Sequence, residues 1–406
     1  MNLFRLLCLF CILRPIFSAS DVVNWTIAGA RMSDVFGIAV SYLFIIVFLA
    51  NLKRIRLDLI TLLILMFCGY MLISLIWAPE VREVMRLVLP FGIFFIARMI
   101  EPDEERLKVL AGCLILGFIL PVVMSTLLII SGKSVDATIF WTGLVRYQGA
   151  FNGAHTLAHS MFICLFGCLL YLLLSFRKGK PPRMMIIGIT ALSILAVYNL
   201  YCSYTRTVFV GLAAFLLIFF YYNRNYRLFS CSILATGAMA VFSGMAKKIF
   251  FDVYEPLVGT VKTFDNMGSG RIGGWKRILE NFLSSNIEEQ IRGLGISSRA
   301  TITSGAHFGG SHNDWLSVLV CFGYIGFLLY LTLFCSIVLR MLFSSLDRAL
   351  RAPFISFVCT VAIMNLLSNS YLTRFELAQY FCLVVGLFYG LDDVHRKASA
   401  KKMMRT

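Results

Sequence analysis

The sequence predicts an all-α polytopic integral membrane protein with about twelve transmembrane helices. Hydrophobic residues make up 59% of the 406-residue chain and charged residues only 14%, and the mean hydropathy is +0.83. Typical soluble domains carry about 25% charged residues. A compact soluble fold has too little interior for this much apolar surface. We therefore expect residues 1–406 to form a single transmembrane domain.

Apolar stretches long enough to cross a bilayer recur along the chain, since a span needs about 20 mostly apolar residues. The first stretch also resembles a signal peptide, because Arg5 precedes its apolar run and small residues follow at 18–20. We expect a first span instead, since Arg14 and Pro15 interrupt the apolar run, although the cleaved signal remains an alternative. The expected spans lie near residues 3–20, 35–52, 58–77, 84–99, 108–131, 156–176, 184–203, 207–223, 228–246, 312–339, 352–370 and 377–391.

The basic residues between these spans predict the orientation. If the N-terminus is cytoplasmic, the cytoplasmic segments hold 21 basic residues and the short loops on the opposite side hold seven: Arg31, Arg82, Arg86, Lys133, Arg146, Arg206 and Arg374. This asymmetry agrees with the positive-inside rule and places both termini in the cytoplasm. The excess of basic residues that gives the net charge of +16 is therefore explained by the orientation of the chain in the membrane. Nucleic-acid binding is not expected, because no basic patch or known binding motif is present.

A long segment separates the ninth and tenth expected spans. Residues 247–311 are relatively polar and rich in glycine, and the topology places them on the outer, periplasmic face. A connection of this length usually carries function or structure of its own. Within it, Trp275, Ile278, Leu279, Phe282 and Leu283 recur at helical spacing. We expect an amphipathic helix that lies at the membrane interface, with a solvated linker as the alternative.

Arginine residues on the outer face are the first candidates for chemistry. Arg206 lies between two spans, Arg271 follows a Gly-Ser-Gly turn, and Arg146 precedes the span that begins near residue 156. Placing a charged side chain at membrane depth costs free energy, so such a residue is by default a candidate for a functional role. The planar guanidinium group suits phosphate oxygens. Each arginine taken singly could equally anchor the protein to lipid headgroups.

Histidines supply the second set of candidates. His312, in the segment Ser311-His312-Asn313, lies where a span enters the membrane, and an imidazole can take up a proton near neutral pH. His155 and His159 have a spacing compatible with a metal site, but no HExxH motif is present, and we expect no metal there. The twelve cysteines lie in apolar stretches or at their ends and indicate neither disulfides nor metal ligands. No cofactor is expected.

Several short motifs occur in a recognisable order. They are Gly149-Ala-Phe-Asn152, Tyr204-Thr-Arg206, Ser269-Gly-Arg271 with Trp275, Gly293-Leu-Gly295, Ser311-His312-Asn313 and Gly323-Tyr-Ile-Gly326. This order, with a long outer segment between the motifs, resembles the superfamily of O-antigen ligases and O-antigen or exopolysaccharide polymerases. The resemblance covers residues 146–330, whereas the preceding part of the chain is similar only in its hydropathy. His155 departs from the family pattern, because a small residue or an asparagine is expected at this position.

The resemblance implies a bacterial inner-membrane glycosyltransferase that works on the periplasmic face. Its donor would be a saccharide on undecaprenyl diphosphate, and its acceptor a glycan on a lipid-linked repeat unit or on lipid A-core. Arg206 and Arg271 would hold the diphosphate, His312 would act as base, and Arg146, Asn313 and Trp275 would bind substrate. The family chemistry is inverting and independent of metal, which is consistent with the absence of a DxD motif.

Two activities within the superfamily share these features. A polymerase extends the chain on a lipid-linked repeat unit, whereas a ligase transfers the finished chain to lipid A-core. We favour the polymerase, for which a chain-length regulator is a candidate partner. A polysaccharide or lipid transporter is the alternative from another class, but it should place ionisable groups near the bilayer midplane instead of at the outer rim.

Overall fold

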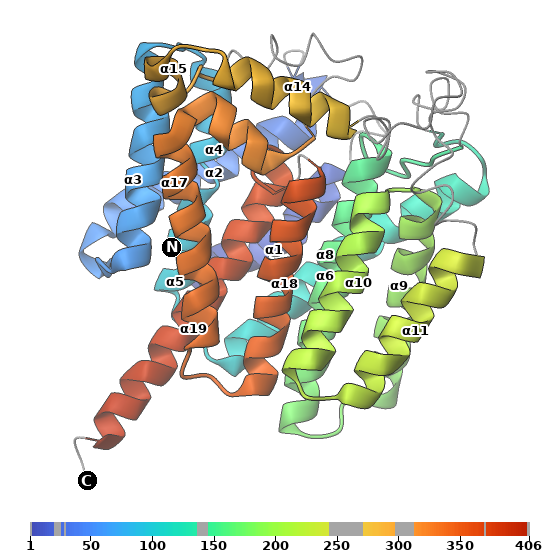
Figure 1. Cartoon of the computed structure of the whole chain (residues 1–406). Coiled ribbons are helices and arrows are strands. Elements are labelled where there is room, and N and C mark those ends of the chain that lie inside the picture. Colours follow the sequence, from blue (N-terminus) through green and yellow to red (C-terminus); the bar gives the residue numbers. More distant parts are fainter. Residues whose placement is uncertain are drawn as a thin grey trace.

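The structure is a computed structural model that describes residues 2–19, 26–27, 30–135, 145–242, 271–296, 312–368 and 371–403. Nearly all of these residues are helical, which confirms the predicted all-α class. The described strands are the two-residue β1 (Thr26–Ile27) and β2 (Ala30–Arg31), which pair antiparallel. The structure therefore has the architecture of a helical membrane bundle (Figure 1).

The helices follow the predicted apolar stretches closely. Their bounds are α1 (Leu3–Ser18), α2 (Met32–Ala50), η2 (Leu52–Arg54), α3 (Leu59–Ile73), η3 (Ser74–Ile76), α4 (Val81–Val88), α5 (Phe91–Met99), α6 (Glu104–Ile130), α8 (Ala154–Lys178), α9 (Arg183–Cys202), α10 (Arg206–Tyr222), α11 (Tyr226–Phe242), α14 (Arg271–Leu283), α15 (Ile287–Arg292), α17 (Asp314–Leu342), α18 (Arg348–Leu367) and α19 (Phe375–Met403). The end of the expected span 228–246 lies outside the described residues, as does much of the segment 247–311.

Length and hydropathy qualify eight of the described helices as candidate membrane spans. They are α2, α3 together with η3, α6, α8, α9, α17, α18 and α19. The helix α10 is apolar but has only 17 residues. A polytopic membrane protein is thus supported, and the number of about twelve spans stays a prediction.

The expected single span at residues 84–99 is wrong as a continuous helix. The structure instead has two short helices, α4 and α5, separated by Leu89 and Pro90. Proline has no backbone N–H to donate, and its ring clashes with the preceding turn. The chain therefore interrupts its hydrogen bonding at Pro90 and starts a second helix at Phe91.

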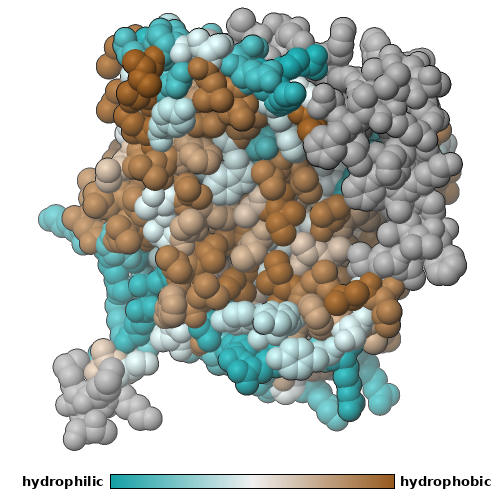
Figure 2. All heavy atoms as spheres, viewed as in Figure 1, coloured by the Kyte–Doolittle hydropathy of each residue, from teal (hydrophilic) through white to brown (hydrophobic). Residues whose placement is uncertain are grey.

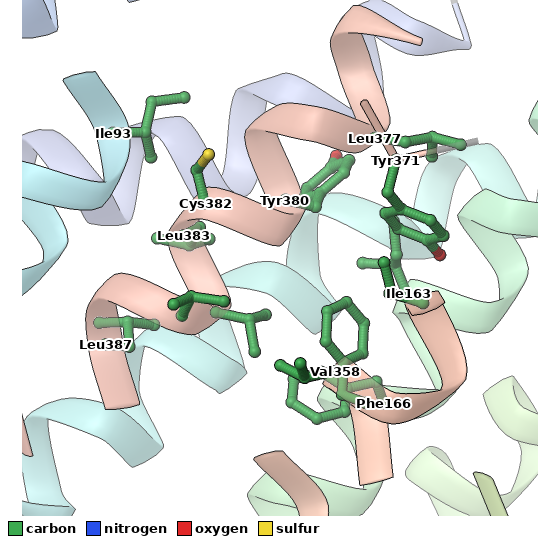
Figure 3. Packing of buried hydrophobic residues seen from close by; sticks show 14 of the residues in the cluster. Ile93, Ile163, Phe166, Val358, Tyr371, Leu377, Tyr380, Cys382, Leu383 and Leu387 are labelled. Atoms are coloured by element: carbon green, nitrogen blue, oxygen red, sulfur yellow. The ribbon is translucent and has the colours of Figure 1, made fainter. Parts of the chain in front are cut away.

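Phenylalanine, leucine and small residues fill the interior of the bundle. Figure 3 shows Phe166 near Val358 in one part of the core and Leu383 and Leu387 of α19 in another. The helices α1 and α6 pack closely at Gly117, where an added Cβ would lie 2.5 Å from the carbonyl oxygen of Ile12. Small residues at such crossings allow helix backbones to approach within a membrane, where dispersion between packed helices replaces the hydrophobic effect as the attraction.

A polar network attaches the first helix to the last. The side chain of Arg14 in α1 is fully buried, donates a 2.6 Å hydrogen bond to Gln379 and lies 3.5 Å from Glu376. Gln379 in turn donates to Ser41 of α2 at 2.8 Å. A buried charge needs such partners, because leaving water is costly for an ion. The segment 3–18 is accordingly an integral part of the folded bundle.

The two ends of the bundle differ in what they carry. Figure 1 shows the connections from α8 to α9, α10 to α11 and α17 to α18 at one end, and α14 and α15 at the opposite end. On the face shown in Figure 2, hydrophobic side chains cover the middle and hydrophilic ones gather toward both ends. An apolar middle between two polar ends is the distribution expected for a protein that crosses a bilayer.

Ion pairs stabilise the end that holds the α17–α18 connection. Arg98 lies 2.7 Å from Asp58 and 2.9 Å from Asp393, and Arg340 lies 2.7 Å from Asp392. Asp392 and Asp393 are almost fully buried. Their carboxylates are therefore used in holding α5, α17 and α19 together.

The orientation can be tested with a reporter that is active only outside the cytoplasm. A fusion at about residue 290, in α15, should be active, and a fusion after Lys180, in the α8–α9 connection, should be silent. The reason is the excess of basic residues at the α8–α9 end, which the positive-inside rule places in the cytoplasm. The reverse pattern would overturn the predicted topology.

Candidate functional site

Several helix ends meet at the end of the bundle that carries α14. They are the starts of α8, α10, α17 and α19 and the end of α18, together with residues 203–205. Hydrogen bonds described below join these segments to one another. The three arginines predicted from the sequence all lie here, on segments that are distant along the chain.

Arg146 is held against the connection between α9 and α10. Its Nε atom donates to the carbonyl oxygen of Ser203 at 3.2 Å, and its Nη2 atom donates to Oγ1 of Thr205 at 3.3 Å. The hydroxyl of Thr205 donates to the carbonyl oxygen of Ala154, at 3.2 Å. These contacts position the guanidinium group beside the start of α8.

Arg206 and Arg271 are the first residues of α10 and α14. Tyr204 adopts a positive φ of 47° just before α10, so the chain turns sharply there. Arg271 donates to the carbonyl oxygen of Leu367, at the end of α18. Because α10 also packs against α18, the two arginines are brought to the same helix end.

The three arginines interact electrostatically. Burial first, and then repulsion by Arg206 and Arg146, lower the pKa of Arg271 to about 10. At neutral pH the group is still protonated, so three positive charges remain close together. Guanidinium groups that lie close together create a positive potential, which attracts anions.

Arg374 is a fourth cation at this site and was not among the predicted site residues. It lies just before α19 and donates a 3.4 Å hydrogen bond to Oγ1 of Thr156 in α8. The only indication in the sequence was that Arg374 is one of the seven basic residues expected in the short loops on the outer side. Its proximity to α8 depends on the fold, because 218 positions separate it from Thr156.

His312 lies immediately before α17 and is joined to the Arg374 segment by Asp314. The Asp314 side chain is fully buried, and its oxygens accept from the backbone N–H of Leu372 at 3.1 Å and from the hydroxyl of Thr373 at 2.7 Å. His312 adopts a positive φ of 46°. This conformation is strained for a residue with a side chain, and such strain is concentrated at functional sites.

The other two predicted substrate-binding residues have different surroundings. The side-chain oxygen of Asn313 accepts from the backbone N–H of Leu316 at 3.0 Å and so caps α17. Trp275 lies one helical turn after Arg271 on α14. Ile278 and Phe282, which follow on the same helix, pack against Val320 of α17. Residues 271–283 are therefore helical, with an apolar face that rests on α17.

The glycine motifs form a joint between α15 and α17. The backbone N–H groups of Leu294 and Gly295 donate to the carbonyl oxygens of Val320 and Cys321 at 3.0 and 2.9 Å. At this point α17 is broken by Gly323, whose φ is +63°. A Cβ at Gly323 would lie 2.4 Å from the nitrogen of Gly293, which leaves no room for a side chain. The two motifs thus fix the segment after α14 onto the helix that follows His312.

His155 and His159 lie one turn apart on α8, and among the described residues no group of three or more His, Cys, Asp or Glu side chains is arranged so that it could hold a metal ion. His159 is fully buried, and its ring packs edge-on against Tyr371 with centroids 5.4 Å apart. His155 lies one turn earlier, within electrostatic range of Arg374, Arg146 and Arg271. The structure thus places His155, which was not among the predicted site residues, close to Arg146, Arg271 and Arg374.

The fold and the site define a polytopic helical membrane protein with a cationic site at one end of its bundle. Residues 191–331 match the family model described as O-antigen ligase. The match confirms the resemblance to the O-antigen ligase and polymerase superfamily, and it includes Arg206, Arg271 and His312. Arg146 lies outside the matched region, but its side chain hydrogen-bonds to Ser203 and Thr205 within that region. No match to a curated protein was found.

Proposed function

We propose that the chain is a glycosyltransferase of the bacterial inner membrane that transfers a saccharide from undecaprenyl diphosphate to a sugar acceptor on the periplasmic face. The favoured reaction is polymerisation of O-antigen or exopolysaccharide repeat units. Both termini would be cytoplasmic. The proposed partners are the lipid-linked donor, an acceptor glycan and, for the polymerase, a chain-length regulator.

The observation that carries this proposal is the convergence of Arg146, Arg206 and Arg271 at one helix end. Each comes from a different part of the chain, and Arg206 and Arg146 both act electrostatically on Arg271. Guanidinium groups donate hydrogen bonds in a planar fork that fits phosphate oxygens. Two linked phosphates offer enough charge and enough acceptor atoms to occupy several such groups together.

The chemistry proceeds by displacement at the anomeric carbon of the donor sugar. An acceptor hydroxyl forms the new glycosidic bond while the bond to the diphosphate oxygen breaks with inversion. Arg206 and Arg271 stabilise the negative charge that develops on the leaving diphosphate. His312 accepts the proton of the attacking hydroxyl. Trp275, Arg146 and Asn313 would contribute to substrate binding, and no step requires a metal ion.

A ligase is the second candidate, and the matched family model is described as O-antigen ligase. A ligase would use the same donor and the same leaving group. It would differ in the acceptor, which is lipid A-core instead of a lipid-linked repeat unit. The cationic site is compatible with both reactions, because both release a diphosphate.

A deletion strain distinguishes the two reactions. If the protein is a polymerase, cells that lack it should still attach single repeat units to the core or to the lipid carrier, because only chain growth is lost. The measurement is the band pattern of extracted polysaccharide on a gel, with the wild-type gene on a plasmid as the control. A bare core together with full-length chains on undecaprenyl diphosphate would show a ligase and overturn the polymerase proposal.

A further inference from the structure

His155 lies close to Arg146, Arg271 and Arg374, and the proposed reaction does not assign it a role. It is the second residue of α8, and its Nδ1 atom is buried and hydrogen-bonds to none of the residues that the structure describes. A buried polar atom without a partner is unfavourable. It is retained most easily where a ligand supplies the partner.

The neighbours of His155 are fixed on both sides. The carbonyl oxygen of Ala154 accepts from Thr205, whose hydroxyl also accepts from Arg146. Oγ1 of Thr156 accepts from Arg374. Both guanidinium groups are thereby tied to residues adjacent to His155 in the first turn of α8, and Arg271 also acts on His155 electrostatically.

The arginines and His155 offer different hydrogen-bonding atoms. Guanidinium groups have only N–H donors, whereas one nitrogen of a neutral imidazole is an acceptor. A sugar joined to a diphosphate brings phosphate oxygens, which need donors, and hydroxyl groups, which need acceptors. The arginines satisfy the first requirement, and Nδ1 of His155 is available for the second.

We propose that His155 is a donor-sugar binding residue, whose Nδ1 atom accepts a hydrogen bond from a hydroxyl of the sugar attached to the diphosphate. The inference rests on the proposed function, since it takes the cluster to hold a glycosyl diphosphate. It assigns to His155 a part in choosing the sugar, whereas the arginines recognise the phosphates that every such donor shares. Sites built to pair a substrate hydroxyl discriminate strongly against analogues that lack it.

The test compares two ligands and two variants in the purified full-length protein. One ligand is undecaprenyl diphosphate without a sugar, and the other is the lipid-linked saccharide extracted from cells that lack the enzyme. His155→Phe keeps a ring and removes both nitrogens, whereas His155→Asn keeps an acceptor atom near the position of Nδ1. His395→Phe, at the far end of α19, is the matched control.

For His155→Phe we expect binding of the lipid-linked saccharide to weaken roughly tenfold, the loss of about one well-placed hydrogen bond. Binding of sugar-free undecaprenyl diphosphate should change less than about twofold, and His155→Asn should stay near wild type with both ligands. Equal weakening for both ligands in His155→Phe, or no weakening for either, would overturn the role of His155. Failure of the proposed function has a different signature, because the wild-type protein would then bind neither lipid.

Discussion

Replacing Arg206 or Arg271 with alanine should reduce polymer formation at least about a hundredfold, because each guanidinium group stabilises the charge that develops on the leaving diphosphate. The assay measures polymer formed from lipid-linked donor in proteoliposomes. Arg206→Lys and Arg271→Lys should also lose most activity, since an ammonium group keeps the charge without the planar fork. Arg31→Ala changes an exposed arginine outside the site and should be nearly as active as wild type.

The arginine variants should remain folded and inserted in the membrane. The pKa of Arg271 is lowered in the folded protein, so its protonated form costs stability at every pH below about 10, including neutral pH. Removing the group removes this cost together with the hydrogen bond to Leu367. Loss of activity with a normal level of membrane-inserted protein therefore indicates a role in the reaction. Full activity in both alanine variants would reject the proposed diphosphate site.

The same assay checks the proposed independence from metal. A chelator present throughout should leave wild-type polymer formation unchanged, because arginines take the part that a carboxylate-held cation has in other glycosyltransferases. Activity that disappears on adding the chelator and returns with a divalent cation would contradict the proposed chemistry.

Replacing His312 with alanine should lower kcat by about a hundredfold or more, the usual contribution of a positioned acid or base. KM for the lipid-linked donor should change little, because His312 is proposed to act on the acceptor hydroxyl in the transition state. The measurement is initial rate against donor concentration at saturating acceptor. The contrast with the arginine variants is informative, since their loss should include weaker donor binding.

A matched substitution supports the assignment of His312. His395→Ala changes a histidine on the last helix, at the opposite end of the bundle, and should keep kcat within about twofold of wild type. If His312→Ala raises KM for the donor and leaves kcat unchanged, His312 is a binding group for the donor and the proposed base must be sought elsewhere.

Hydropathy alone predicted most of the helices, because a chain in lipid has to satisfy its backbone hydrogen bonds within each segment. Long apolar runs therefore become helices with little influence from their neighbours, and α6, α8 and α17 lie close to the predicted spans. The break at Pro90 shows the limit of this rule. Hydropathy averages over a window and does not register the hydrogen-bond donor that is missing at Pro90.

The candidate site could be predicted in part. Arg146, Arg206 and Arg271 were found because outer-face arginines are unusual and because short motifs surround two of them. Arg374 and Asp314 were not predicted as site residues, because Arg374 stood out only as one of the few basic residues on the outer side and Asp314 has no distinguishing local pattern. Their importance follows from hydrogen bonds to Thr156 and Thr373, which join segments far apart in the sequence.

The membrane class, most of the helices and the types of side chain available to bind phosphate follow from the amino-acid sequence alone. These properties depend on composition and on local spacing, and both can be read along the chain. The packing of the helices, in contrast, brings Arg206 and Arg146 close enough to act on Arg271 and places His155 near Arg146, Arg271 and Arg374. Charge–charge interactions and hydrogen bonds act over a few ångströms in space, so helices that pack side by side create the site whatever the number of residues between them.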